Sequence, residues 1–274
     1  MSALAGDPGP PAFRHIQRWI WRYSSADGAT PTRVVAEETP VAFAYAGISY
    51  AVMMASPADL EDFAVGFSLN EGVIRSPDEI EELDIIRTDD GILLRMDLAN
   101  GPADAFWQRR RYLSGPSGCG LCGLESLAQA VRRPRAVTGG IRASATAIYG
   151  AMKMLPAWQT LNRLTGAVHA AAFWTPDDGI VAVREDVGRH NALDKLTGAV
   201  AAGGRAGIEG AVLLTSRVSV EMVQKAASLG AAILAAISAP TTLALRMADA
   251  AGITLIAVAR DDGFETFTHP HRLF

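Results

Sequence analysis

The chain has 274 residues, of which 49% are hydrophobic and 20% are charged, and its formal net charge at pH 7 is −4. This composition is typical of a globular protein with enough apolar residues for one large core or two smaller ones, and we expect two domains. A slightly acidic chain has no general attraction for nucleic acid or for anionic membranes, so the composition argues against both as partners.

The N-terminal segment and the longest uncharged run argue against a secreted protein and a membrane protein. Residues 1–12 are rich in proline and glycine and are expected to be disordered. They contain neither the basic nor the apolar stretch of a signal peptide. The run 229–245 is interrupted by Ser238 and Pro240 and is too short to span a bilayer. We therefore expect a cytoplasmic protein.

Residues 13–114 have the pattern of a small α+β domain. The expected elements, in chain order, are a hairpin over 40–54 that turns at Ala46-Gly47, a helix capped by 56–59 and ending near Asn70, a short helix after a second cap at 76–79, and a hairpin formed by 84–88 and 91–98.

Residues 115–143 are expected to form a linker that begins with a glycine-rich loop. This loop holds the only two cysteines of the chain, Cys119 and Cys122. Its four glycines and one proline between 115 and 123 exclude a regular helix or strand, so both thiols are predicted to lie on a loop of low bulk.

A Cys-x-x-Cys pair alone allows several chemistries, namely half a zinc site, a redox disulfide or a persulfide relay. Zinc within one chain is disfavoured because a closed site needs four ligands and the five histidines show no paired spacing, whereas zinc shared between two chains stays open. A disulfide oxidoreductase usually places its first cysteine at the start of a helix, and glycines on both sides fit that geometry poorly.

Arginines cluster unevenly around the cysteine loop. They are either solvated side chains on helix faces or groups that lower the thiol pKa and collect an anionic ligand, and the sequence does not decide between the two. The cluster consists of Arg109, Arg110, Arg111, Arg132, Arg133, Arg135 and Arg142.

Residues 144–274 alternate between helices and strands, and the strands are apolar enough to be buried on both faces. The pattern predicts an α/β domain with a mostly parallel sheet, flanking helices and right-handed crossovers. The expected elements are a helix at 145–164, a hairpin at 169–174 and 180–184, a helix from Gly188 to 202, strands at 211–215, 232–237 and 254–259, and helices at 218–229 and 240–251.

Polar residues follow three of these strands, at 184–195, 216–221 and 260–263. Ligands of open α/β sheets bind at the carboxyl ends of strands, although helix capping and ion pairs at the sheet edge would explain the same residues. The helix that starts after Val187 offers N–H groups to an anion. Within the first group, His190 is spaced to pair with Asp186 or Asp194 on one helix face.

Several motifs together resemble the FdhD family of sulfur carriers needed for formate dehydrogenase activity. They are GCGLCG at 118–123, GAVHAAAFW at 166–174, EDVGRHNALDK at 185–195, TSRVSVEMVQKA at 215–226, SAPTTLA at 238–244 and THPHRL at 268–273. The resemblance implies a cytidine-deaminase-like fold for 144–274. His169 would then be a remnant of the deaminase zinc motif, with Ala171 in place of the catalytic glutamate.

The resemblance implies a sulfurtransferase that moves persulfide sulfur from a cysteine desulfurase to the molybdenum cofactor before its insertion into formate dehydrogenase. Cys119 would carry the persulfide and Cys122 would act as relay or resolving partner, and no resident metal is implied. The cofactor, Mo-bis(molybdopterin guanine dinucleotide), or a guanine nucleotide such as GDP, would bind at Val258, Ala259, Arg260, Asp261, Asp262 and Gly263.

Two other functions and the assembly state complete the expectations. A non-catalytic chaperone for the molybdenum cofactor and a thiol-disulfide oxidoreductase are the alternatives to the sulfurtransferase. The resemblance also implies contact with the catalytic subunit of formate dehydrogenase, and a homodimer is expected.

Overall fold

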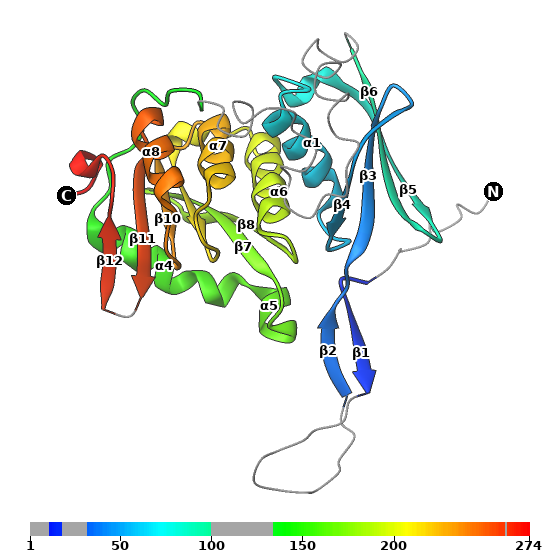
Figure 1. The fold of residues 1–274 in the computed structure, drawn as a ribbon, viewed down its shortest axis with the longest axis horizontal. Coiled ribbons are helices and arrows are strands. Elements are labelled where there is room, and N and C mark those ends of the chain that lie inside the picture. Colours follow the sequence, from blue (N-terminus) through cyan, green and yellow to red (C-terminus); the bar gives the residue numbers. More distant parts are fainter. Residues whose placement is uncertain (1–10, 18–31, 100–133, 261) are drawn as a thin grey trace, which may run out of the picture.

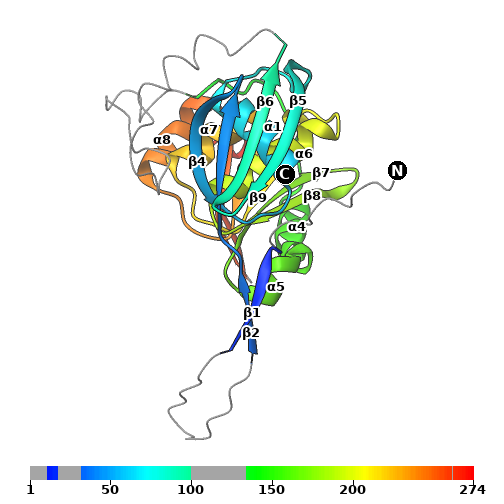
Figure 2. The ribbon, with the colours of Figure 1, turned by 90° about the vertical axis from the view of Figure 1, so that its right-hand side faces the viewer.

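The computed structural model describes residues 11–17, 32–99, 134–260 and 262–274, and it arranges them in two units joined side by side (Figure 1). The N-terminal unit is built on a four-stranded sheet and the C-terminal unit on a six-stranded sheet. A separate two-stranded ribbon projects from the body of the protein (Figure 2), below the strands of the N-terminal unit in Figure 1.

The four-stranded sheet has the order β4-β3-β6-β5, and helix α1 covers one of its faces. Its elements are β3 (Thr39–Tyr45), β4 (Ile48–Ala55), α1 (Leu60–Glu71), a 3-10 turn η1 (Pro77–Glu79), β5 (Ile80–Thr88) and β6 (Gly91–Leu98). Phe43 stacks on Phe67 with ring centroids 4.0 Å apart and meets Phe63 edge-on at 4.9 Å. These aromatic contacts form the centre of the N-terminal core.

The hairpins expected in this unit are confirmed. Ala46 and Gly47 occupy the turn between β3 and β4 with φ of 48° and 73°, the sign that a two-residue hairpin turn requires. The second cap is also confirmed, because the Glu79 carboxylate accepts a hydrogen bond from the Ser76 N–H.

The six-stranded sheet has the order β12-β11-β10-β9-β7-β8 and is covered by helices on both faces. Its elements are α4 (Ala145–Trp158), α5 (Thr160–Thr165), β7 (His169–Thr175), β8 (Gly179–Asp186), α6 (Arg189–Ala202), η2 (Gly207–Glu209), β9 (Ala211–Leu214), α7 (Val220–Leu229), β10 (Ile233–Ala236), α8 (Thr242–Ala251), β11 (Thr254–Arg260), β12 (Gly263–Thr266) and η3 (Pro270–Arg272).

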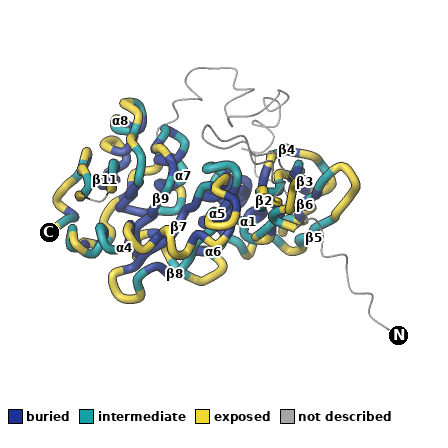
Figure 3. The backbone as a smooth tube through the Cα atoms, turned by 90° about the horizontal axis from the view of Figure 1, so that it is seen from below, coloured by how far each residue is buried: buried dark blue, intermediate teal, exposed yellow. Residues whose placement is uncertain are grey.

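Alternate residues of each central strand supply two separate cores. Figure 3 shows β9 coloured as buried. In β9, Val212 and Leu214 pack toward α6, α7 and α8, whereas Ala211 and Leu213 pack toward α4. Burial on both faces explains why these strands are apolar throughout.

The expected parallel arrangement is confirmed only for the centre of this sheet. Strands β9, β10 and β11 are parallel, but β7 runs antiparallel to β9, and β8 and β12 join the edges through hairpins. The sheet is therefore mixed rather than mostly parallel, because a hairpin return needs no crossover helix. The specific likeness to cytidine deaminases stays a prediction.

Two further features differ from the sequence prediction. The helix expected at 145–164 is divided at Gln159 into α4 and α5, after Pro156 in the last turn of α4. The ribbon of β1 (Phe13–Gln17) and β2 (Thr32–Ala36) was not predicted, and it contacts α5 through a hydrogen bond from Arg33 Nη2 to the Thr165 carbonyl at 3.2 Å. Of the expected disordered segment, residues 1–10 lie outside the described residues.

The two units meet where α1 lies against α6. Gly66 of α1 and Gly198 of α6 allow close contact, because a Cβ on either residue would overlap the backbone of the other helix at Asp194 or Asp62. The expected domain boundaries stay a prediction, since most of the expected linker is not described. No helix within the described ranges is long and apolar enough to cross a membrane.

The glycine contact gives a first prediction. Gly198→Ala should lower the free energy of unfolding by about 1–3 kcal/mol, because the added methyl group must push α1 away from α6. The matched control is Gly150→Ala in α4, where a Cβ has open space and should stabilise the helix by up to about 1 kcal/mol. Denaturant unfolding measures both, and equal effects of the two substitutions would contradict the close packing.

Candidate functional site

The three polar groups predicted at strand ends do lie along one edge of the six-stranded sheet. The carboxyl ends of β8, β9, β10 and β11 share this edge with the amino ends of β7 and β12. Open α/β sheets bind their ligands outside the carboxyl ends of the parallel strands, so this is the edge at which a ligand is expected.

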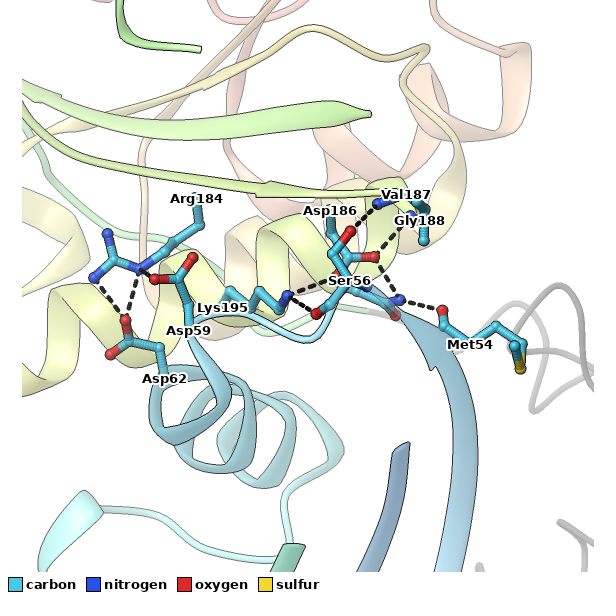
Figure 4. Close-up of polar contacts among 10 residues, drawn as sticks. Met54, Ser56, Asp59, Asp62, Arg184, Asp186, Val187, Gly188 and Lys195 are labelled. Carbon is cyan, nitrogen blue, oxygen red and sulfur yellow. Dashed lines mark hydrogen bonds and ion pairs between the residues drawn. The ribbon is translucent and has the colours of Figure 1, made fainter. Parts of the chain in front are cut away.

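The first group, at the end of β8, contains a carboxylate that is completely buried, Asp186 (Figure 4). Its oxygens accept hydrogen bonds from Ser56 N at 2.9 Å, Gly188 N at 2.7 Å, Asn191 Nδ2 at 2.9 Å and Lys195 Nζ at 2.7 Å. Four donors around one carboxylate replace the water it loses on burial. Asp186 therefore organises the turn from β8 into α6.

Lys195 is the partner cation and is also completely buried. Its Nζ donates to the Ser56 carbonyl at 2.9 Å and lies 5.4 Å from the centre of the Phe63 ring in the N-terminal unit. The buried ion pair thus joins the end of β4, helix α1 and helix α6.

Ser56 differs from its expected role. Helix α1 begins where predicted, but its N-cap is Asp59, with φ 53° and ψ 44° and no capping hydrogen bond from its side chain. Ser56 instead contacts the other unit through its N–H, its carbonyl and its hydroxyl, which accepts from Val187 N at 3.2 Å. The backbone of β4 is held further by Asn191 Nδ2, 2.8 Å from the Met54 carbonyl.

Two more polar contacts connect the units beside this network. Arg184 binds Asp62 with its guanidinium 2.6 Å from the carboxylate, and Asp59 lies 3.7 Å away (Figure 4). Asp194 accepts from Asn70 Nδ2 at 2.7 Å and pairs with Lys225. Burial raises the pKa of Asp194 above its ordinary value, and Lys225 opposes that shift.

Glu185 has a local structural role in the same motif. Its carboxylate accepts from Leu161 N at 2.7 Å and from Asn162 N at 2.8 Å, which satisfies the first N–H groups of α5. The contacts of Glu185, Asp186 and Lys195 are therefore helix capping and ion pairing at the edge of the sheet, and these structural roles explain why the three polar residues occur there.

A second cluster of polar residues lies at the N-termini of α6 and α7. At least one of its buried polar atoms, Arg189 Nε, has no hydrogen-bond partner among the described residues. His190 Nε2 is 3.8 Å from Glu221 Oε2, so its expected pairing with Asp186 or Asp194 is wrong, because those carboxylates are occupied by Lys195 and Lys225. His190 lowers the pKa of Glu221 to about 2. Burial lowers the pKa of His169, and the positive charges of Arg189 and His190 lower it further, against the opposing effect of Asp186.

Residues 258–263, which the family resemblance implies for cofactor binding, lie where β11 turns into β12. The pairing shifts between Ala257 and Arg260, and Val258 within this bulge has a positive φ of 53°. Val258 N donates to the Ser238 carbonyl at 3.3 Å, which ties the bulge to the loop after β10. Arg260 and Asp262 are exposed, and Asp261 lies outside the described residues.

The predicted sulfur residues, Cys119 and Cys122, lie outside the described residues, as do five of the seven clustered arginines. Of the remaining two, Arg142 lies over the Phe274 ring at 5.5 Å. Within the described part of the chain, no group of three or more metal-ligating side chains comes together.

These features define a two-unit α/β protein whose units are joined by a buried ionic network at the edge of the larger sheet where β9, β10 and β11 end. Residues 36–274 match the model of the FdhD/NarQ family. The chain is 51% identical over 267 residues to the sulfur carrier protein FdhD of Agrobacterium fabrum, which covers 96% of each chain. The chain belongs to the FdhD/NarQ family.

Two other comparisons agree with this assignment. The sulfur carrier protein FdhD of Cupriavidus necator is 46% identical, with 99% of this chain and 93% of that protein covered. The crystal structure of a formate dehydrogenase accessory protein from Desulfotalea psychrophila superimposes with a TM-score of 0.73 at 25% identity, covering 96% of this chain and 100% of that one.

Sequence reasoning missed the residues of the N-terminal unit that complete the ionic network. Ser56 and Met54 contribute mainly backbone groups, which carry no sequence signal. A lysine and an aspartate nine residues apart in EDVGRHNALDK were the available signal for the Asp186–Lys195 pair.

The buried pair gives a second prediction. Lys195→Met should lower the free energy of unfolding by about 3–5 kcal/mol, because it leaves the Asp186 carboxylate buried without its cation. Arg205→Met removes the cation of an exposed pair with Asp178 and should cost no more than about 1 kcal/mol. Chemical denaturation compares the two, and a Lys195→Met protein as stable as the Arg205→Met protein would rule out the network as the joint between units.

Proposed function

We propose that this chain is a sulfur carrier that serves formate dehydrogenase, receiving sulfur as a persulfide on Cys119. The observation that carries the proposal is a Cys-x-x-Cys pair in a chain 51% identical over nearly its full length to a sulfur carrier protein. The likeness to a formate dehydrogenase accessory protein supports the choice of client enzyme.

The sulfur enters by thiol–disulfide chemistry. The Cys119 thiolate attacks the outer sulfur of a cysteine persulfide on a cysteine desulfurase, and the desulfurase cysteine leaves as a thiolate. No electrons are gained or lost, because one sulfur–sulfur bond forms as the other breaks. Cys122 then serves as relay or resolving partner for the sulfur that Cys119 holds.

The acceptor in this proposal is the molybdenum cofactor, Mo-bis(molybdopterin guanine dinucleotide), bound as a substrate before its insertion into the formate dehydrogenase catalytic subunit. The β11–β12 turn suits a bound nucleotide, because its bulge and the exposed Arg260 and Asp262 sit at the ligand-binding edge of the sheet. A carboxylate at 262 can accept hydrogen bonds from the N–H edge of guanine.

The first test of the proposal replaces the sulfur-bearing residue. Cys119→Ser should load no persulfide when incubated with a cysteine desulfurase and cysteine, and it should fail to activate formate dehydrogenase. Intact mass spectrometry measures the added sulfur, and formate oxidation measures activation. Cys122→Ser is the matched control and should still gain sulfur on Cys119. Full client activation by Cys119→Ser would favour a non-catalytic cofactor chaperone instead.

The second test separates nucleotide binding from sulfur loading. Changing Asp261 and Asp262 together to alanine should alter the affinity for GDP, by weakening it if they bind the guanine edge or strengthening it if they repel phosphate. Persulfide loading of Cys119 should stay at the wild-type level, because a nucleotide site needs no thiol. Calorimetry and intact mass measure the two, and an unchanged GDP affinity would place the nucleotide elsewhere.

A further inference from the structure

The four-stranded sheet of the N-terminal unit has one face that no helix of the described ranges covers. Helix α1 packs on the opposite face, above side chains such as Phe43 and Leu94. Figure 2 looks onto the uncovered face, which we call the outer face, and α1 lies behind the sheet in that view. Successive residues of a strand point to opposite faces, so the residues that alternate with the core residues form the outer face.

The middle of the outer face is apolar. The pairing of the strands places one row of apolar side chains across all four strands, in the order Val52, Ala42, Leu93 and Ile86. Met54 and Pro40 are paired beside this apolar row, and the side chains of Val52 and Met54 are 50% and 46% exposed. A sheet face in contact with water is usually polar, so an apolar row indicates a surface that a partner covers.

Acidic side chains lie next to the apolar row on the same face. Glu82 and Asp97 are directly opposite each other on β5 and β6, and the neighbouring pair is Asp84 with Arg95. Like charges directly opposite each other destabilise a sheet, so the fold alone does not explain the Glu82–Asp97 pair. One guanidinium among three carboxylates leaves this acidic strip with an excess of negative charge.

The polarity and charge of the outer face define the kind of partner that fits it. A protein surface with apolar side chains beside lysines or arginines is complementary to both the apolar row and the acidic strip. A second copy of this chain is less suitable, because its outer face has the same excess charge. Four strands about 4.8 Å apart and about eight residues long cover roughly 500 Å², more than half of the about 800 Å² that one partner buries in a standard interface.

The outer face also lies where the chain leaves the N-terminal unit toward Cys119. Strand β6, which supplies Leu93 and Asp97, is the last described element before the segment 100–133 that contains Cys119. The β11–β12 turn, which is proposed to bind the cofactor, lies at the opposite end of the protein (Figure 1). The outer face is therefore better placed for a protein that delivers sulfur to Cys119 than for the client that receives the cofactor.

We propose that the outer face is the docking surface for the sulfur donor, a cysteine desulfurase that presents apolar side chains among basic ones. This inference rests on the proposed function, since sulfur delivery is the reason for contact with a desulfurase. The apolar row provides the contact that excludes water, and the acidic strip increases the rate of encounter and sets the orientation. Docking holds the two proteins together while sulfur passes to Cys119.

Sulfur loading from a desulfurase, compared with loading from a small molecule, tests the docking surface. The double variant Val52→Thr/Met54→Gln makes the apolar row more polar and keeps side chains of similar size. At subsaturating desulfurase with cysteine, it should gain persulfide on Cys119 at least about fivefold more slowly than wild type, because it loses apolar contacts at the interface. With inorganic tetrasulfide, which needs no docking, the two proteins should load at the same rate. Intact mass spectrometry follows both reactions.

Met154→Gln is the matched control for this experiment. Met154 is 58% exposed on α4 in the other unit, and the variant should load like wild type from both sources. Equal rates for wild type and Val52→Thr/Met54→Gln with the desulfurase would overturn the docking surface. Slower loading of the double variant from tetrasulfide would overturn it as well, because the substitutions would then act on Cys119 itself. Failure of wild type to load from either source would instead contradict the sulfur-carrier proposal.

The acidic strip gives a second variant whose effect on stability is opposite to its effect on docking. Glu82→Gln/Asp97→Asn removes the like-charge pair, so resistance to denaturant should be unchanged or higher. Loading from the desulfurase should be slower than in wild type and should depend less on ionic strength. The exposed Glu209→Gln, at η2 in the other unit, is the control and should behave like wild type. Unchanged loading and salt dependence in the double variant would contradict the role of the strip.

Two further measurements identify a different occupant of the outer face. Light scattering should give the same mass in solution for wild type and Val52→Thr/Met54→Gln. A wild-type dimer that becomes a monomer in the variant would show that a second copy covers the face. A variant that loads normally from the desulfurase but fails to activate formate dehydrogenase would show that the client binds there. Either result would overturn the assignment to the sulfur donor.

Discussion

The buried contact between Asp186 and Lys195 is the interaction on which the arrangement of the two units depends. Neither charge could stay in an apolar interior alone, and each is stabilised by groups from both units, including the backbone of Ser56 and the ring of Phe63. The glycine contact between α1 and α6 brings the units close enough for these short hydrogen bonds. The ionic network at this interface therefore depends on the close packing of α1 against α6.

The same network also fixes the turn at which α6 begins. By accepting from Gly188 N and Asn191 Nδ2, Asp186 fixes the turn that starts α6, and this places Arg189 and His190 beside the start of α7. Different residues of the EDVGRHNALDK motif therefore have different partners. Glu185, Asp186 and Lys195 are satisfied at the start of α5 and at the contact between the units, whereas His190 lies beside Glu221 at the start of α7.

The sequence predicted the elements well where local patterns determine them. The 40–54 hairpin, the start of α1 and the β9 to β11 series follow from turn residues and apolar periodicity, and the structure confirms them. It did not predict that β7 runs antiparallel to β9, or that His190 faces Glu221, because strand direction and long-range partners depend on the tertiary fold. The ribbon of β1 and β2 was missed because each strand has only five residues and residues 18–31 separate them, so no short turn marks a hairpin. The roles of Cys119, Cys122 and Asp261 stay predictions.

The joint between the units also limits how this protein can be divided. Cutting the chain between α1 and α6 would expose the Gly198 face of α6 and remove the donor and acceptor that Ser56 gives to Asp186 and Lys195. The Asp186–Lys195 pair of the C-terminal unit, which is buried in the intact protein, would then be exposed to water. Although each unit has its own sheet and core, neither is an interchangeable module, and the protein is expected to gain or lose its structure as one cooperative body.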